Sequence, residues 1–446
     1  MASQTDSVAH AVAGAGTSLR RELNWVDCAA LVAGGVIGSG IFLVPASIAG
    51  QLPHFSEVML MWVVGGALTV FGALSMAELG AMFPGAGGIY IYLREIYGRP
   101  MAFMYGWGLL AMIHSGSVAT LASGFSVYVG QLFGLSAPGQ KATGVIAVAA
   151  LTWLNSLGIR TGKLTTNTIT VAKLGGLAAM IAMLLARGNP GELLAGPWLP
   201  SGLPPIAPMG IALVGVLWAY EAWHQVCFVA GEIRQPERDL PRGLLVGTLA
   251  IVAVYLLANT AYYSVMTTEQ IRGSTAVAAA ALAQTYGPGA VTFISVLLVI
   301  SILGALHTCV ICGPRVYYAM AQEGLFFKRF SWLHPKYRVP TIGLVVQGVW
   351  GAALTLTSNF QQLFTYVIFT AWIFYGLGVF GVILLRIRRP DLPRPFKVPG
   401  YPVTPALFAL AAAGLTINTI VTDPRNALFG IAFVALGIPL YWFFRR

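Results

Sequence analysis

Charged side chains are scarce in this sequence. Only 9% of its 446 residues are Asp, Glu, Lys or Arg, whereas 57% are hydrophobic. A water-facing surface of this size needs far more polar residues, so lipid must be the solvent for most of the chain. The apolar residues form long runs and not short alternating ones, which predicts membrane helices and excludes a membrane β-barrel.

Cysteine and histidine are also rare. All four cysteines, Cys28, Cys227, Cys309 and Cys312, fall in apolar runs, so we expect no structural disulfide. Cys309 and Cys312 have CxxC spacing, which within a membrane helix indicates two small apolar side chains on one face. The six histidines are scattered, and the runs contain no HExxH metal motif and no phosphate-binding loop. We therefore expect no enzyme, no metal site and no cofactor.

Apolar runs long enough to cross a bilayer, about 20 residues each, occur twelve times. They lie near residues 26–49, 58–83, 100–133, 143–158, 164–186, 206–230, 243–266, 288–320, 341–357, 361–385, 403–421 and 427–444. The space between them leaves no room for a separate soluble domain. Residues 1–19 are small and polar, which predicts a disordered tail and not a cleaved signal.

The basic residues are distributed unequally between the two sides of this topology. Twenty of the twenty-six Lys and Arg residues fall on one side. The exceptions are Lys141, Arg187, Arg272 and Arg425 on the other side, and Lys173 and Arg315 within runs. The positive-inside rule places both termini in the cytoplasm of a multi-pass plasma-membrane protein. The basic residues that give the net charge of +11 therefore set the orientation in the membrane and contact lipid headgroups. No nucleic-acid partner is expected.

The first run contains an unusual density of glycine. Gly34, Gly35, Gly38 and Gly40 fall within seven residues, and each costs a helix about 0.5–1 kcal/mol relative to alanine. Close packing of helices through small residues is the alternative explanation. The density exceeds what packing usually requires, so we expect the helix to be interrupted here.

An interruption at membrane depth must line protein or a wet cavity. The half-helix that begins near Ser39 would offer its N–H groups to an anion, while the half-helix that ends near Ile37 would offer carbonyls to a cation. An amino acid carries both charges on one carbon. This pattern predicts a site for an amino acid head group.

The sixth run carries a glutamate among aromatic residues, in Trp218-Ala219-Tyr220-Glu221. If Glu221 is ionised it would pair with a cationic side chain or amine, and if it is protonated it would favour neutral substrates. His224, three residues on, is either a proton relay or a packed histidine. The first and sixth runs are five helices apart, as in an inverted repeat.

Several segments, taken in order, resemble one family. They are Gly38–Phe42, Glu78–Gly88 with Tyr90–Gly98, Trp218–Trp223 with Gly231–Arg242, and Pro314–Leu325 with Pro340. Together they resemble the amino acid/polyamine/organocation superfamily, and the segment around Trp218 resembles its L-type amino acid transporter branch.

This resemblance extends over about residues 23–400 and implies an all-α, LeuT-like fold. Residues 1–22 would be a cytoplasmic tail, and residues 401–446 would hold the eleventh and twelfth helices. The first five helices (about 23–190) and the next five (about 205–390) would be inverted repeats.

The resemblance also implies a substrate site. The carboxylate would meet the N–H groups of Ser39, Gly40 and Ile41. The ammonium would meet the carbonyls of Ile37, Trp218 and Glu221, with the Trp218 ring as a gate. Gly38, Ala219 and Tyr220 complete the expected substrate-binding set. The family often carries glycine where Ala222 stands, which puts the unwinding of the sixth helix in doubt.

Lys173 lies about nine residues into the fifth run, or roughly 14 Å deep at 1.5 Å per residue. A buried ammonium predicts a functional role with carbonyl or hydroxyl partners, and the alternative is that Lys173 lies at the end of a run whose boundary is slightly misplaced. In the family resembled, a lysine here stands where sodium-driven relatives bind sodium, which implies sodium independence.

We therefore expect a sodium-independent secondary transporter, an amino acid exchanger working by alternating access. The alternatives are a proton-coupled amino acid or polyamine symporter, a uniporter, and a sensor that binds an amino acid without moving it. Residues 134–143 contain no cysteine, so no disulfide-linked heavy subunit is expected.

Overall fold

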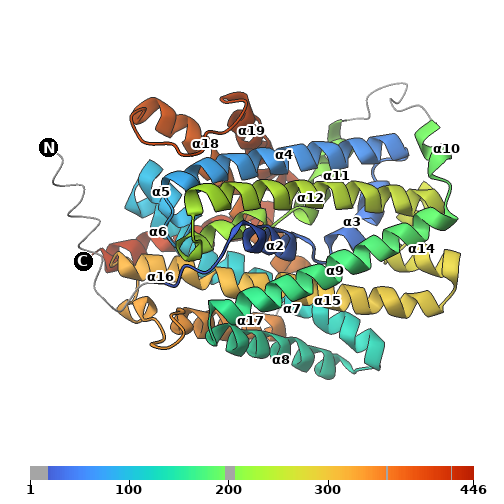
Figure 1. Cartoon of the computed structure of the whole chain (residues 1–446), viewed down its shortest axis with the longest axis horizontal. Coiled ribbons are helices and arrows are strands. Elements are labelled where there is room, and N and C mark those ends of the chain that lie inside the picture. The colour runs from blue at the N-terminus through green and yellow to red at the C-terminus, as the bar shows by residue number, and fades with distance from the viewer. Residues whose placement is uncertain (1–18, 196–205, 358–359, 423, 446) are drawn as a thin grey trace.

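A computed structural model describes residues 19–195, 206–357, 360–422 and 424–445, which form an elongated bundle of helices (Figure 1). In these ranges the β-structure is limited to one bridge, between Leu23 and Ile233. The predicted all-α class is confirmed for the described chain.

Most of the elements fall close to the predicted runs, whereas five short helices of the described chain lie between the runs. In chain order they are α2 (Trp25–Val36), α3 (Gly40–Ala49), α4 (Phe55–Met82), α5 (Ile89–Tyr97), α6 (Arg99–Gly108), η1 (Leu109–Ile113), α7 (His114–Phe133), α8 (Ala137–Ser156), α9 (Ile159–Arg187), α10 (Pro190–Ala195), α11 (Ile206–Ala219), η2 (Trp223–Glu232), α12 (Pro236–Val265), α13 (Thr268–Arg272), α14 (Val277–Tyr286), α15 (Gly289–Cys312), α16 (Pro314–Gln322), η3 (Lys328–Ser331), α17 (Thr341–Thr357), α18 (Phe360–Arg388), α19 (Val403–Thr422), α20 (Pro424–Ala435) and α21 (Gly437–Phe444). Most of the predicted tail lies outside the described residues.

Most of these helices are long and apolar enough to cross a membrane. Within the described ranges nine pass that test, and the bent pair α2 and α3 makes a tenth. The other two predicted runs correspond to α8 and to α17, which has only 17 residues. The membrane character of the fold is therefore confirmed, whereas twelve crossings and the inverted repeat stay predictions.

Helix α2 lies at the centre of the bundle, with α9, α12 and α15 against it (Figure 1). Two glycines of α12 make the close approach possible, because a Cβ on Gly247 would lie 2.7 Å from the Cβ of Val32 and one on Gly243 would lie 3.0 Å from the carbonyl of Trp25. The same helix α12 also packs along α4. The interrupted helix is thus held on several sides by unbroken ones.

The short helices α5, α6 and α16 lie at one end of the bundle, and α10 and α14 lie at the other (Figure 1). Ion pairs join segments at the α5 end: Arg94 contacts Glu323, and Arg386 contacts Glu78 at 2.5 Å. A third pair, Arg315 with Glu232, has both side chains fully buried and two bonds of 2.9 and 3.1 Å. These contacts join separate helices at this end of the bundle.

The chain before α2 is fastened at the same end. The N–H groups of Glu22 and Leu23 both donate to the carbonyl of Glu232 at 2.9 Å, and the N–H of Arg234 returns to the carbonyl of Leu23 at 2.9 Å. This is the bridge between Leu23 and Ile233. It ties the start of α2 to the end of η2.

Candidate functional site

The first helix is interrupted where its glycines are densest. Helix α2 ends at Val36, α3 begins at Gly40, and their axes differ by 48°. The N–H of Gly38 folds back onto the carbonyl of Val36 at 2.8 Å. The first N–H groups of α3 have no acceptor within their own helix. The predicted interruption is therefore present, with backbone donors at one end and carbonyls at the other.

The sixth helix is interrupted too, despite its alanine. Helix α11 ends at Ala219, the N–H of Glu221 donates to the carbonyl of Trp218 at 3.0 Å, and η2 begins at Trp223. Ala222 between them has φ of +83°, in the left-handed region that favours glycine. The sixth helix therefore unwinds although alanine stands where the family often has glycine, and Ala222 is strained at the turn.

Two side chains bind the carbonyl of Ile37. The Nζ of Lys173 donates to it at 2.8 Å and to the carbonyl of Gly34 at 2.6 Å. The Oγ of Ser301 lies 2.9 Å from it and 3.0 Å from the carbonyl of Gly38, so its single hydroxyl hydrogen is shared between these two carbonyls. Lys173 and Ser301 are both fully buried. The cationic lysine thus lies against the carbonyl end of α2, as a cation should.

A single hydroxyl connects the two interruptions. The Oη of Tyr255, on α12, lies 3.2 Å from the carbonyl of Val36 and 3.1 Å from the carbonyl of Ala219. These carbonyls belong to the last residues of α2 and α11. Tyr255 was not among the predicted site residues, because nothing in the sequence pattern distinguishes it from the other tyrosines of apolar runs.

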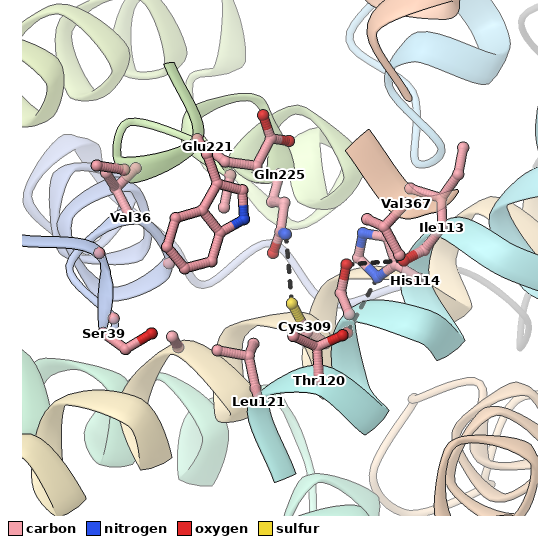
Figure 2. Close-up of a pocket in the computed structure, with 18 of the residues that line it drawn as sticks. Val36, Ser39, Ile113, His114, Thr120, Leu121, Glu221, Gln225, Cys309 and Val367 are labelled. Carbon is pink, nitrogen blue, oxygen red and sulfur yellow. Dashed lines mark hydrogen bonds between the residues drawn. The ribbon is translucent and has the colours of Figure 1, made fainter. Parts of the chain in front are cut away.

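A cavity of about 80 Å³ lies where the two interruptions meet. Its walls come from α2, α3, the end of α11, the turn after it, α7, α15 and α18 (Figure 2). Among the nine expected substrate-binding residues, six line it: Gly38, Ser39, Gly40, Trp218, Ala219 and Glu221. Ile37, Ile41 and Tyr220 are fully or almost fully buried behind this wall.

Glu221, Tyr375 and His224 form one hydrogen-bonded group beside the cavity. The Oη of Tyr375 donates to Oε1 of Glu221 at 3.0 Å and lies 3.0 Å from Nε2 of His224. The Nδ1 of His224 is 3.8 Å from the same Glu221 oxygen. His224 is buried behind the cavity wall, whereas Glu221 and Tyr375 line it.

Several further polar residues line the cavity and were not predicted as site residues, among them Gln225, His114 and Cys309. Gln225 donates from Nε2 to the Sγ of Cys309 at 3.4 Å, and Nδ1 of His114 lies 3.3 Å from the carbonyl of Cys309 (Figure 2). His114 follows a π-helical turn, Leu109–Ile113, and such turns are frequent at functional sites. Cys309 is therefore more than a small apolar side chain, because its thiol faces the cavity.

In the described part of the chain, no group of three or more His, Cys, Asp or Glu side chains has the geometry of a metal site. The four cysteines are all buried and free.

Comparison with known proteins gives consistent matches over nearly the whole chain. The family model described as "Amino acid permease" matches residues 23–444. The human b(0,+)-type amino acid transporter 1 is 32% identical over 440 residues, which cover 96% of this chain and 88% of that protein.

Two other relatives give similar figures. The serine/threonine exchanger SteT of Bacillus subtilis (strain 168) is 30% identical over 430 residues, which cover 95% of this chain and 97% of that protein. The human large neutral amino acids transporter small subunit 2 is 30% identical over 444 residues, which cover 96% of this chain and 81% of that protein.

Proposed function

This chain belongs to the amino acid permease family, and from that premise we propose that it is a sodium-independent amino acid exchanger that works by alternating access. It is an amino acid transporter and not an enzyme, since the family and the relatives it matches are transporters. Exchange is favoured over symport because one relative of similar length is named as an exchanger. Proton-coupled symport, uniport and sensing without transport stay as alternatives.

The observation that carries the proposal is the meeting of two interrupted helices at one cavity. A substrate carboxylate would bind the first N–H groups of α3, at Ser39, Gly40 and Ile41, where the helix dipole favours negative charge. Gly40 allows that approach because it has no side chain. This is the arrangement that transporters with discontinuous helices use for amino acids.

The ammonium position needs a revision of the expectation from sequence. The carbonyl of Ile37 already accepts hydrogen bonds from Lys173 and Ser301, and a carbonyl oxygen has two lone pairs. We therefore propose the carbonyls of Trp218 and Glu221 as the principal acceptors. The Trp218 ring, which lines the cavity, remains the proposed gate.

Sodium independence is supported by the geometry around Lys173. Its ammonium lies on two carbonyls at the end of α2, which is the kind of position that a coordinated cation takes in related transporters. Both the lysine and Ser301 are buried there. A fixed protein cation in this place would remove the need for a sodium ion.

We propose twelve crossings in five-plus-five inverted repeats followed by two helices, with both termini in the cytoplasm of a plasma-membrane protein. The basic side chains at the α5 and α16 end support that orientation. The bundle containing the two interrupted helices would rock against α7, α8, α15 and α17. No disulfide-linked heavy subunit is proposed, because residues 134–143 carry no cysteine.

Uptake into proteoliposomes tests the proposal. Labelled amino acids and amines would be offered to vesicles with and without unlabelled amino acid inside, in sodium-free buffer and with an imposed proton gradient. Stimulation by internal amino acid without sodium is the expected result. Gradient-driven uptake into empty vesicles would replace exchange by proton-coupled symport, and binding without any uptake would indicate a sensor.

A further inference from the structure

A long apolar groove opens on the outside of the bundle between α18 and α19. These two helices lie side by side, and α4 packs against α19 (Figure 1). The groove has a volume of about 580 Å³ and shares no lining residue with the substrate cavity. Of the described residues that line it, only Trp372 and Thr416 carry a polar atom in the side chain. Such a wall offers a polar ligand almost no partners and suits hydrocarbon.

Small residues create the groove. A Cβ on Gly376 would lie 2.9 Å from the Cβ of Ala412, so α18 and α19 come close to each other along its floor. Ala413 continues the α19 wall, where a larger side chain would fill the space. Phe380 and Leu410 line the groove as well, and they are 41% and 69% exposed. The groove is therefore open on the face that these two apolar helices turn to the membrane.

The length of the groove matches one leaflet of a bilayer. It follows α18 from Trp372 to Ile383 and α19 from Ala406 to Ile417, which is about 17 Å along each helix at 1.5 Å per residue. One leaflet contributes about 15 Å of hydrocarbon, half of the bilayer core. A single acyl chain fits this length, whereas a membrane-spanning helix of a partner would be about 30 Å long.

One end of the groove lies beside the connector between the two helices. Helix α18 ends at Arg388, which follows Ile383 after little more than one turn, and α19 begins at Val403, just before Ala406. The segment 386–400 carries five basic residues and one acidic residue, Asp391. A strongly basic segment at the end of an apolar groove complements an anionic headgroup.

Two of these basic side chains are free to bind a ligand. Three others have carboxylate partners, namely Arg386, Arg389 and Arg394. Arg388 and Lys397 are exposed, and within the described chain their side chains form no hydrogen bond or ion pair. They thus offer charge at the mouth of the groove without giving up an existing contact.

We propose that the groove binds one acyl chain of an anionic phospholipid, with the headgroup at Arg388 and Lys397. Guanidinium and ammonium groups form charge-assisted hydrogen bonds with phosphate. In the orientation given by the proposed function, on which the choice of leaflet rests, this lipid belongs to the cytoplasmic leaflet. The chain runs toward Trp372 and Thr416, which also line a smaller cavity of about 20 Å³ with Leu217 of α11. Its methyl end therefore lies near the interrupted sixth helix.

Two lipids with the same chains test the proposal. The purified full-length transporter is titrated with anionic dioleoylphosphatidylglycerol or with zwitterionic dioleoylphosphatidylcholine, and bound lipid is counted by native mass spectrometry. Each basic side chain beside an anionic headgroup favours binding by about fivefold. We therefore expect the anionic lipid to bind about five- to thirtyfold more tightly than the zwitterionic one.

Substitutions at the mouth of the groove test the headgroup contact. The double variant Arg388→Gln, Lys397→Gln should bind both lipids with similar affinity. The control is Arg238→Gln with Arg242→Gln, because these exposed basic residues at the start of α12 do not line the groove. The control should keep the preference of the wild type for the anionic lipid.

Filling the groove tests the acyl-chain contact. Ala413→Phe places a ring where the chain should lie, and displacing two methylenes from an apolar site costs about tenfold in affinity. The variant should bind both lipids about tenfold more weakly. Gly414→Phe is the matched control, since a Cβ on Gly414 meets nothing within 4 Å and the residue does not line the groove. It should bind both lipids as the wild type does.

The contrary outcomes are distinct. Equal affinity of the wild type for the two lipids would refute the headgroup contact, and unchanged lipid binding by Ala413→Phe would refute the groove as the site. If Ala413→Phe instead separates a dimer and leaves lipid binding unchanged, the groove is a contact between copies of this chain and the inference is wrong. Lipid binding is measured without transport, so amino acid exchange stands or falls separately.

Discussion

The Nζ of Lys173 lies 2.8 Å from the carbonyl oxygen of Ile37, at the point where the first helix stops. The lysine comes from the middle of α9 and is fully buried. Its ammonium also bonds the carbonyl of Gly34. A charge placed this deep has no water to solvate it, so these carbonyls are what makes its burial possible.

Lys173→Ala should therefore impair transport. The variant loses two charge-assisted bonds, each worth about 1.5–3 kcal/mol, and leaves the end of α2 without its cation. We expect the exchange rate in proteoliposomes to fall at least about tenfold. Lys141→Ala is the control, since Lys141 bonds a carbonyl in an exposed position. Normal exchange by a correctly inserted Lys173→Ala protein would remove the lysine from the mechanism.

Gly40→Val should abolish substrate binding. A Cβ at this position would lie 2.9 Å from the Cα of Ala219, so a side chain here pushes apart the two interrupted helices as well as covering the N–H groups of α3. The measurement is the affinity for the amino acid that wild type exchanges. Gly175→Val provides the comparison, because a Cβ on Gly175 meets nothing within 4 Å. Retained affinity in the Gly40 variant would contradict the carboxylate assignment.

Ala222→Gly should stabilise the protein. An alanine in the left-handed region raises the free energy of the folded state by about 1–2 kcal/mol, and a glycine there does not. Since glycine also gives the unfolded chain more freedom, the net gain in the free energy of unfolding is expected to be about 0.5–1 kcal/mol. Thermal unfolding in detergent measures it, with Ala222→Val predicted to lower the midpoint. A lower midpoint for the glycine variant would show that the turn relaxes in some other way.

Tyr255→Phe should slow exchange while the protein remains folded. The change removes only the hydroxyl that lies between the carbonyls of Val36 and Ala219, so the two interruptions lose the hydrogen-bonding group that they share. Initial rates of exchange are compared with those of Tyr286→Phe, whose hydroxyl bonds the carbonyl of Met183 at 2.8 Å in an exposed position. Equal rates for the two variants would argue against a coupling role for Tyr255.

Arg315→Leu should destabilise the protein strongly. It leaves the carboxylate of Glu232 buried without its partner, and breaking such a pair typically costs about 3–5 kcal/mol. A low yield of folded protein and a lowered unfolding midpoint are expected. Arg272→Leu, which removes an exposed ion pair with Glu269, should change the midpoint little. Similar midpoints for both variants would mean that the buried pair is dispensable.

Patterns within the chain predicted much of this architecture. Apolar runs located the long helices, with ends that differ by at most seven residues, but not the short helices between them. The glycines of the first run predicted its interruption at Ile37 to Ser39. These features depend on local composition, since glycine density weakens a helix wherever it lies. The depth of Lys173 likewise predicted carbonyl or hydroxyl partners, and its Nζ bonds the carbonyls of Gly34 and Ile37.

Three polar residues that line the cavity could not be predicted in this way. His114, Gln225 and Cys309 are single polar residues in separate helices, and their meeting depends on how α7, η2 and α15 pack. The turn at Ala222 is also a tertiary effect, because alanine favours helix in isolation. Only the three-dimensional arrangement shows that Lys173 and Ser301 already bond the carbonyl of Ile37.

The bridge between Leu23 and Ile233 has a mechanical consequence. Three backbone hydrogen bonds fasten the strand of chain before α2 to the end of η2, while Tyr255 connects the opposite ends of α2 and α11. The first and sixth helices are therefore joined at the α5 end of the bundle and again where both are interrupted. In the proposed transport cycle, a displacement of either helix would carry the other with it.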